Sequence, residues 1–91
     1  MSQRIDGSTV LVTGGAGLIG STIVEQLFDS GAAEVRVLDN LVSGRMANLD
    51  AVRNRRGFVF QNGDIRDRTA VAKAVTGCDY VFHQAAIRIT L

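Results

Sequence analysis

The sequence predicts an α/β fold in which parallel β-strands alternate with α-helices. Short segments rich in β-branched residues recur along the chain. The first of them is followed by a segment whose apolar residues recur at three- and four-residue spacing, and a run of glycines separates these two segments. This alternation is typical of a parallel sheet with right-handed crossovers. The chain has 91 residues, of which 46% are hydrophobic and 21% charged, and therefore has the size of one globular unit.

The first strand and helix are predicted within the first thirty residues. Residues 8–13 form an apolar, β-branched run without polar alternation, as expected for a strand that is covered on both faces. After the glycines, apolar residues return at helical spacing, and these are Ile19, Gly20, Ile23, Val24, Leu27 and Phe28. We expect an amphipathic helix that ends before Gly31.

The remainder predicts three more strands and a further helix. Strands are expected at 34–39, 58–62 and 79–83, with a loop over 40–50 that turns into a short helix over 45–52. Asp67 can cap a helix whose apolar stripe is Ala70, Val71, Ala74 and Val75. The predicted strand order is 3-2-1-4. Because this fold normally continues through further strands, we expect residues 1–91 to form a partial domain, the N-terminal half.

Charge and composition argue against several classes of partner. Ten basic and nine acidic residues give a net charge of +1, which predicts neither nucleic-acid binding nor attraction to a membrane surface. The apolar runs are too short for a transmembrane helix, and the first residues lack the pattern of a signal peptide, so we expect a cytoplasmic protein. Cys78 is the only cysteine, which argues against an internal disulfide or a cysteine-rich metal site.

A glycine-rich loop joins the first predicted strand to the first predicted helix. Gly14 permits a tight turn, Gly17 lets the backbone approach a pyrophosphate, and Gly20 lets the helix pack closely on the sheet. Amides at the helix start, those of Leu18 and Ile19 among them, can then receive the phosphates with the help of the helix dipole. The pattern predicts a dinucleotide site of the Rossmann type. The alternative is a loop that only packs tightly.

Asp39 ends the second predicted strand, 19 positions after Gly20. An acidic residue at this spacing accepts hydrogen bonds from the ribose hydroxyls and repels the 2′-phosphate of NADP, so the sequence predicts NAD. Arg45 is the nearby cation that would weaken this preference. The alternative is a solvated aspartate at the end of a strand.

Four segments together resemble the extended short-chain dehydrogenase/reductase family, and within it the NAD-dependent epimerases and dehydratases of sugar nucleotides, typified by UDP-glucose 4-epimerase. The segments are residues 12–20, residues 38–49 with their Leu-Asp-Asn-Leu and Ser-Gly-Arg sequences, residues 63–67 with Gly-Asp-Ile-Arg-Asp, and residues 83–86 with His-Gln-Ala-Ala. The resemblance implies that Asn40 holds the adenosine ribose with Asp39. It also implies that Asp64 accepts from the adenine amino group, that the Ile65 amide faces the ring, and that Ala85 and Ala86 line the cofactor.

The resemblance also implies a nucleotide-sugar substrate and a homodimer for the full-length protein. The family's catalytic Ser/Thr and Tyr-x-x-x-Lys pair have no counterpart in these residues, because Tyr80 lies in a predicted strand without the lysine that should follow. We therefore expect the isolated chain to lack catalysis. His83, the only histidine, is a candidate base without an evident partner. We expect a solvated basic loop at Arg53, Arg55 and Arg56.

Two other functions remain open from the sequence. One is a non-enzymatic dinucleotide sensor, which would lack a Tyr-x-x-x-Lys pair further along the protein. The other is a methyltransferase, which also combines a glycine loop with an acidic strand end. Residues 63–67 favour NAD over S-adenosylmethionine.

Overall fold

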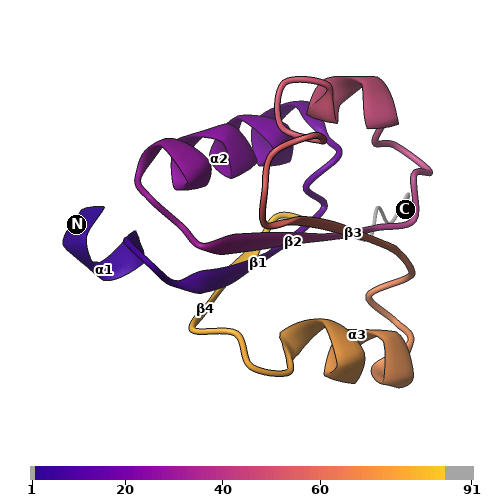
Figure 1. The fold of residues 1–91 in the computed structure, drawn as a ribbon. Helices are drawn as coiled ribbons and strands as arrows, with labels where there is room; N and C mark the ends of the chain where they lie inside the picture. The colour runs from indigo at the N-terminus through magenta and orange to yellow at the C-terminus, as the bar shows by residue number, and fades with distance from the viewer. Residues whose placement is uncertain (1, 86–91) are drawn as a thin grey trace.

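Four parallel strands form one sheet in the computed structural model, which describes residues 2–85 (Figure 1). Their order is β3-β2-β1-β4, as the sequence predicts. The strand bounds are β1 Thr9–Thr13, β2 Glu34–Asp39, β3 Phe58–Asn62 and β4 Tyr80–His83. All four run in the same direction, so their carboxyl ends meet at one edge of the sheet.

The central strand β1 is covered on both faces. Val10 and Val12 point into a core cluster on one face, and Leu11 points into a second cluster on the other. All three side chains are at most 1% exposed. Burial on both faces explains why the β1 sequence lacks polar alternation.

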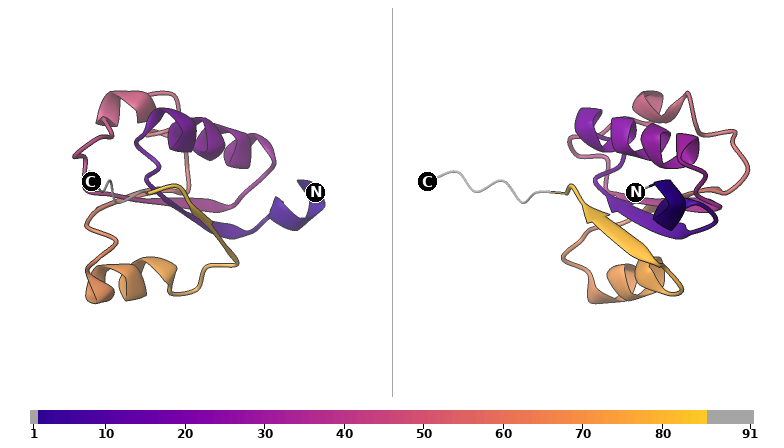
Figure 2. Two further views of the ribbon diagram at one scale, coloured as in Figure 1. Left: turned by 180° about the vertical axis from the view of Figure 1, so that it is seen from behind. Right: turned by 90° about the vertical axis from the view of Figure 1, so that its left-hand side faces the viewer.

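The helices lie in two layers, one on each face of the sheet (Figures 1 and 2). The helix α2 and the 3-10 helix η1 cover one face, and α3 covers the other. A fourth helix, α1, precedes β1. The helix bounds are α1 Ser2–Ile5, α2 Leu18–Asp29, η1 Met46–Leu49 and α3 Arg68–Val75.

The helix α3 is held at both ends by side chains. Asp67 caps its start, as predicted, because its carboxylate accepts from the amides of Thr69 and Ala70 at 2.9 and 3.3 Å. At the other end, the Arg36 guanidinium in β2 donates to the carbonyl of Ala74 at 2.9 Å. The Arg36 contact attaches the helix to β2, the strand that carries Asp39 at its end.

The structure differs from the sequence-based expectation at four places. The strand β1 begins at Thr9 and not at residue 8. The helix α1 was not expected. Residues 45–52 form only the short η1 followed by turns, in which the amides of Asn48 and Asp50 donate to carbonyls three residues earlier. The fourth strand begins at Tyr80 and not at Asp79. The Asp79 carboxylate accepts from the Thr9 amide, and the Asp79 amide donates to the Thr9 carbonyl.

Candidate cofactor-binding site

A cleft of about 660 Å³ opens where the carboxyl ends of the strands meet. These strand ends are on the right in Figure 1. Its walls come from the glycine loop, from the segments after β2 and β3, and from the residues after β4. The lining residues are Gly14, Gly17, Leu38, Asp39, Asn40, Val42, Ser43, Gly44, Gly63, Asp64, Ile65, Arg66, Gln84 and Ala85. This is the edge at which parallel α/β sheets bind ligands.

The glycine loop adopts a backbone path that side chains would block. Gly14 has a φ of +71°, and a Cβ atom there would lie 2.7 Å from the amide nitrogen of Ala85. A Cβ atom on Gly20 would overlap the carbonyl oxygen of Gly14. The two glycines therefore bring the loop against β4 and the helix α2 against the loop.

The start of α2 has no side-chain cap. Its N-cap residue is Gly17, which lines the cleft and offers no capping oxygen. The first amides of a helix have no partner within the helix, so those of Leu18 and Ile19 need an acceptor from elsewhere. An anionic group in the cleft would provide that acceptor and would also interact favourably with the helix dipole.

The carboxylate of Asp39 is only 7% exposed and holds two loop segments together. Its Oδ2 accepts from the Ala16 amide at 3.0 Å, and its Oδ1 accepts from the Leu41 amide at 2.7 Å. A carboxylate has about four acceptor positions, so two remain for a ligand. Asp39 is therefore both a structural residue of the loop and a possible ligand-binding group.

Ala16 connects the glycine loop to the segment after β2. Its carbonyl accepts from the Arg45 amide at 2.9 Å and from the Asn48 side chain at 2.8 Å. Between these segments, Leu41 takes a left-handed conformation with a φ of +62°. The reversal at Leu41 directs the chain along the cleft and leaves the Val42 side chain 84% exposed.

Asp64 follows β3 and forms an ion pair with Arg66. The guanidinium contacts both carboxylate oxygens, the shortest contact being 2.6 Å from Nη2 to Oδ2, and the Arg66 amide donates to Oδ1 at 2.8 Å. The hydrogen bonds from the Arg66 side chain, then that from its amide, lower the pKa of Asp64 to about 2. Asp64 is thus a carboxylate, an acceptor without a proton to donate, under all ordinary conditions.

The end of β4 meets the end of β1 at Thr13, whose backbone carbonyl accepts from the Gln84 amide at 2.9 Å and whose hydroxyl group makes three further contacts. Oγ1 of Thr13 lies 2.8 Å from Nδ1 of His83, and the amides of Gln84 and Ala85 donate to it at 3.1 and 3.3 Å. His83 is exposed and is not among the residues that line the cleft. Ala85 lies in the wall of the cleft, whereas the predicted site residue Ala86 lies outside the described residues.

Most of the predicted site residues come together in the cleft. They are Gly14, Gly17, Asp39, Asn40, Asp64, Ile65 and Ala85. Leu18 and Ile19 do not line it, because their side chains are 79% and 72% exposed and only their amides lie at the start of α2. Gly20 is buried beneath the loop. Whether these residues bind a cofactor stays a prediction.

Sequence reasoning missed several lining residues, namely Leu38, Val42, Ser43, Gly44, Gly63, Arg66 and Gln84. The adjacent Asp39 and Asn40 were the available signal for some of them, because such side chains often bond the backbone two residues later. Here both do so, with Leu41 and Val42 as donors. These two turns fold the segment into the cleft wall.

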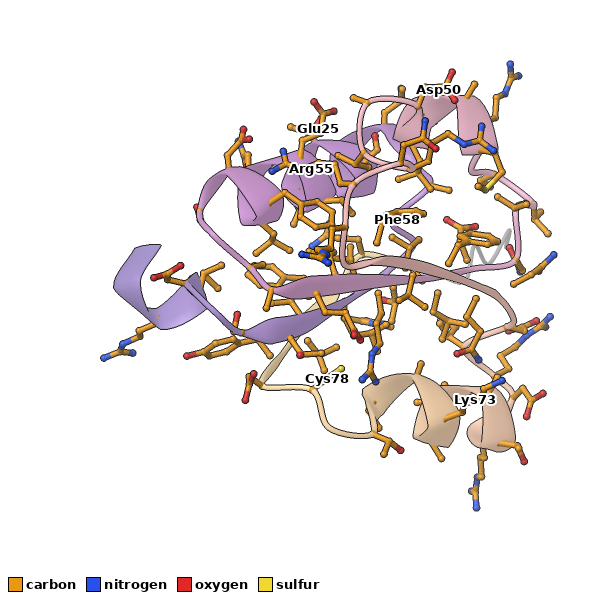
Figure 3. The ribbon with its side chains drawn as sticks, in the orientation of Figure 1. Glu25, Asp50, Arg55, Phe58, Lys73 and Cys78 are labelled. Atoms are coloured by element: carbon orange, nitrogen blue, oxygen red, sulfur yellow. The ribbon has the colours of Figure 1, made fainter. Side chains whose placement is uncertain are left out.

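Other candidates from the sequence lie away from the cleft. Arg55 packs over the ring of Phe28 at 5.0 Å and lies 3.7 Å from Asp29, and Arg53 pairs with Asp50. Arg55 and Asp50 lie on the side of the sheet that α2 covers (Figure 3). On the opposite face, Cys78 lies between the sheet and α3. Burial raises the pKa of this thiol, and it therefore stays protonated at neutral pH.

Residues 2–85 contain no group of three or more His, Cys, Asp or Glu side chains that could hold a metal ion. Within the same range, no helix has both the length and the hydropathy that a membrane crossing requires.

Comparison with known proteins identifies the family. Residues 10–90 match the profile of the NAD dependent epimerase/dehydratase family. The chain belongs to this family. Among its relatives, a dTDP-glucose 4,6-dehydratase from Streptomyces niveus is 42% identical over 83 residues, which cover 85% of this chain and 25% of the relative.

Solved structures of epimerase/dehydratase relatives have the same fold. A dTDP-glucose 4,6-dehydratase from Streptomyces venezuelae, solved with NAD bound, is 42% identical with a TM-score of 0.82, over 89% of this chain and 27% of that one. An enzyme from Bordetella bronchiseptica, solved with NAD⁺ and UDP, is 34% identical with a TM-score of 0.82, over 96% of this chain and 25% of that one. The chain thus spans about a quarter of the length of the relatives it matches.

Proposed function

We propose that this chain binds NAD in the cleft and forms the adenosine and pyrophosphate half of the cofactor site of a nucleotide-sugar epimerase or dehydratase. One observation carries the proposal. The glycine loop, Asp39 and Asp64 are far apart in the sequence, yet all three line one cleft at the carboxyl edge of the sheet. NAD-bound structures of family members support it.

The groups in the cleft fit the parts of NAD in order. The uncapped start of α2 behind Gly17 suits the pyrophosphate, because it offers amides and a favourable dipole to an anion. The free acceptor positions of Asp39, with Asn40 beside it, suit the hydroxyls of the adenosine ribose.

The segment after β3 suits the adenine ring. The Asp64 carboxylate only accepts hydrogen bonds and therefore suits the exocyclic amino group, and Ile65 supplies an apolar wall for the ring. Ala85 continues the site beside β4. When bound, NAD supplies a hydride acceptor, and the role of these residues is to hold and orient it.

The substrate assignment rests on the relatives. One is a dTDP-glucose 4,6-dehydratase and another was solved with UDP in addition to NAD⁺, so a sugar attached to a nucleoside diphosphate is the proposed substrate class. The proton-transfer residues of the reaction are expected outside these 91 residues. The homodimer implied by the resemblance stays a prediction.

Titration calorimetry tests the cofactor assignment. NAD should bind, NADP should bind roughly tenfold more weakly or worse because Asp39 repels its 2′-phosphate, and S-adenosylmethionine should not compete. Stronger binding of NADP would contradict the assignment of Asp39. Preferential binding of S-adenosylmethionine would contradict the proposed function as a whole.

A further inference from the structure

The hydrogen bonds around Thr13 define the protonation state of its neighbour His83. Backbone amides can only donate. Oγ1 of Thr13 accepts from the Ala85 amide at 3.3 Å and, at 3.1 Å, from the Gln84 amide, which also donates to the Thr13 carbonyl at 2.9 Å. A hydroxyl group has two acceptor positions and one hydrogen. Since both acceptor positions are taken, the hydroxyl hydrogen is directed at Nδ1 of His83, 2.8 Å away. Nδ1 is therefore an acceptor, and the proton of the neutral ring is on Nε2.

We propose that neutral His83, protonated on Nε2, is a positioning residue of the cofactor cleft. By accepting the Thr13 hydrogen, it leaves the hydroxyl oxygen free to hold the two amides that begin the segment after β4. The consequence for NAD affinity rests on the proposed function, whereas the state of the imidazole ring does not.

The segment held by Thr13 forms part of the cleft wall. Gln84 and Ala85 both line the cleft, and the Ala85 amide lies so close to Gly14 that a Cβ atom on that glycine would be 2.7 Å from it. A displacement of Ala85 therefore changes the packing between β4 and the glycine loop. The Thr13 hydroxyl connects the exposed imidazole ring to the part of the loop that begins the predicted pyrophosphate site.

Protonation of His83 disrupts this arrangement. A protonated imidazole has a hydrogen on both nitrogens, so Nδ1 can no longer accept from Thr13. Two hydrogens then face each other, unless the hydroxyl turns. Turning weakens its bond to the Ala85 amide, whereas the Gln84 amide keeps the Thr13 carbonyl as an acceptor. Histidine is the side chain that ordinarily titrates between pH 5 and 8, so NAD affinity should fall as the pH is lowered through this range.

No charged side chain in the described residues forms an ion pair with His83. The strand packed against it, β1, has the sequence Thr-Val-Leu-Val-Thr and carries no titratable group. At the same edge of the sheet, Asp39 is bonded to the Ala16 and Leu41 amides, and Asp64 is paired with Arg66. Neither carboxylate is bonded to Thr13, so His83 is the titratable side chain at this edge that contacts its hydroxyl.

Nuclear magnetic resonance of protein labelled with ¹⁵N-histidine tests the state of the ring without any ligand. At pH 8, the His83 signals should show an unprotonated Nδ1 and a protonated Nε2, and they are assigned by their loss in the His83→Asn variant. A ring protonated on Nδ1, or an averaged mixture of the two tautomers, would overturn the proposal.

The pH dependence of NAD affinity tests the positioning role. Between pH 8 and pH 5, the affinity of the unsubstituted protein should fall roughly two- to tenfold, the range expected for one net hydrogen bond. His83→Asn should keep the affinity measured at pH 8 and lose the pH dependence, because its amide oxygen accepts from Thr13 and does not titrate.

Substitutions of Thr13 complete the test. Thr13→Ser should behave like the unsubstituted protein, and Thr13→Val should bind NAD more weakly at every pH without the pH dependence. If Thr13→Val does not fold, His83→Asn still decides. A pH-independent affinity while the ring titrates, or an unchanged pH dependence in His83→Asn, would overturn this proposal alone. Absence of NAD binding at every pH would overturn the proposed function together with the positioning role.

Discussion

The amide of Ala16 donates a 3.0 Å hydrogen bond to Oδ2 of Asp39, and both residues are buried. The residue that the sequence predicts to hold the ribose therefore also fixes the glycine loop. A substitution at Asp39 changes the stability of the loop as well as the cofactor contact. The two effects must be measured separately.

Asp39→Ala should lower the free energy of unfolding by about 1–3 kcal/mol, because the buried amide of Ala16 loses its acceptor. Chemical denaturation measures this loss. Asp50→Ala is the matched control, since Asp50 pairs with Arg53 at the surface and its removal should change stability by less than about 0.5 kcal/mol. Equal losses in the two variants would contradict the role of Asp39 in the loop.

Asp39→Asn should reduce the preference for NAD over NADP. The substitution removes the negative charge that faces the 2′-phosphate and keeps an oxygen that accepts from a backbone amide. The ratio of the two dissociation constants, measured by calorimetry, should move toward one. An unchanged ratio would show that another group selects the cofactor.

Two glycine-to-alanine substitutions separate loop packing from cofactor approach. Gly20→Ala should destabilise the fold by roughly 1–3 kcal/mol, since the new methyl group overlaps the Gly14 carbonyl. Gly17→Ala should leave stability unchanged, because the methyl group meets only that carbonyl at 3.4 Å. It should nevertheless weaken NAD binding, since it occupies the approach to the pyrophosphate. Full NAD affinity in a folded Gly17→Ala variant would argue against this placement.

Asp64→Ala should weaken NAD binding by about 1–3 kcal/mol, the range expected when the amino group of a bound adenine loses its hydrogen-bond acceptor. Nicotinamide mononucleotide, which lacks adenine, should not be affected. Asp67→Ala is a useful comparison, because it removes the cap of α3 and about 1 kcal/mol of stability but no predicted cofactor contact. If both ligands lose affinity equally in Asp64→Ala, the effect is on folding.

Acid should affect the Asp64–Arg66 pair only at very low pH. The pKa of Asp64 is lowered to about 2, so the pair contributes its full stabilisation above the ordinary pKa of an aspartate, near pH 4, and loses it as the pH falls toward 2. Arg66→Gln should move this titration upward. Carboxyl resonances followed by nuclear magnetic resonance would show it, and a midpoint that does not move would contradict the ion pair.

The sheet was predictable because its signals are local. Each strand is a short β-branched or aromatic segment, and the glycine loop fixes where β1 ends and α2 begins. The four residues of α1 are too few to show a helical period. The position of η1 was not predictable either, because its Asn48 side chain bonds Ala16, 32 positions earlier in the sequence.

Site residues could be predicted where the cofactor chemistry, or a close approach between backbone segments, requires one residue type. Gly14 and Asp39 belong to that group, and both line the cleft. Val42 and Ser43 do not, since they reach the cleft through the left-handed turn at Leu41 and not through any property of their side chains. Arg66 enters the cleft wall together with Asp64, which it holds as a carboxylate.

The position of β1 between β2 and β4 also has a consequence for the order of folding. During synthesis, β1 and β2 are complete long before β4, whose His83 lies 70 positions after its partner Thr13. Closing so long a segment of chain is entropically unfavourable, and pairings of this kind slow folding. The last strand of the described sheet to be synthesised joins the first and brings Gln84 and Ala85 with it. The nascent chain therefore gains a complete cleft only when its oldest and newest strands meet.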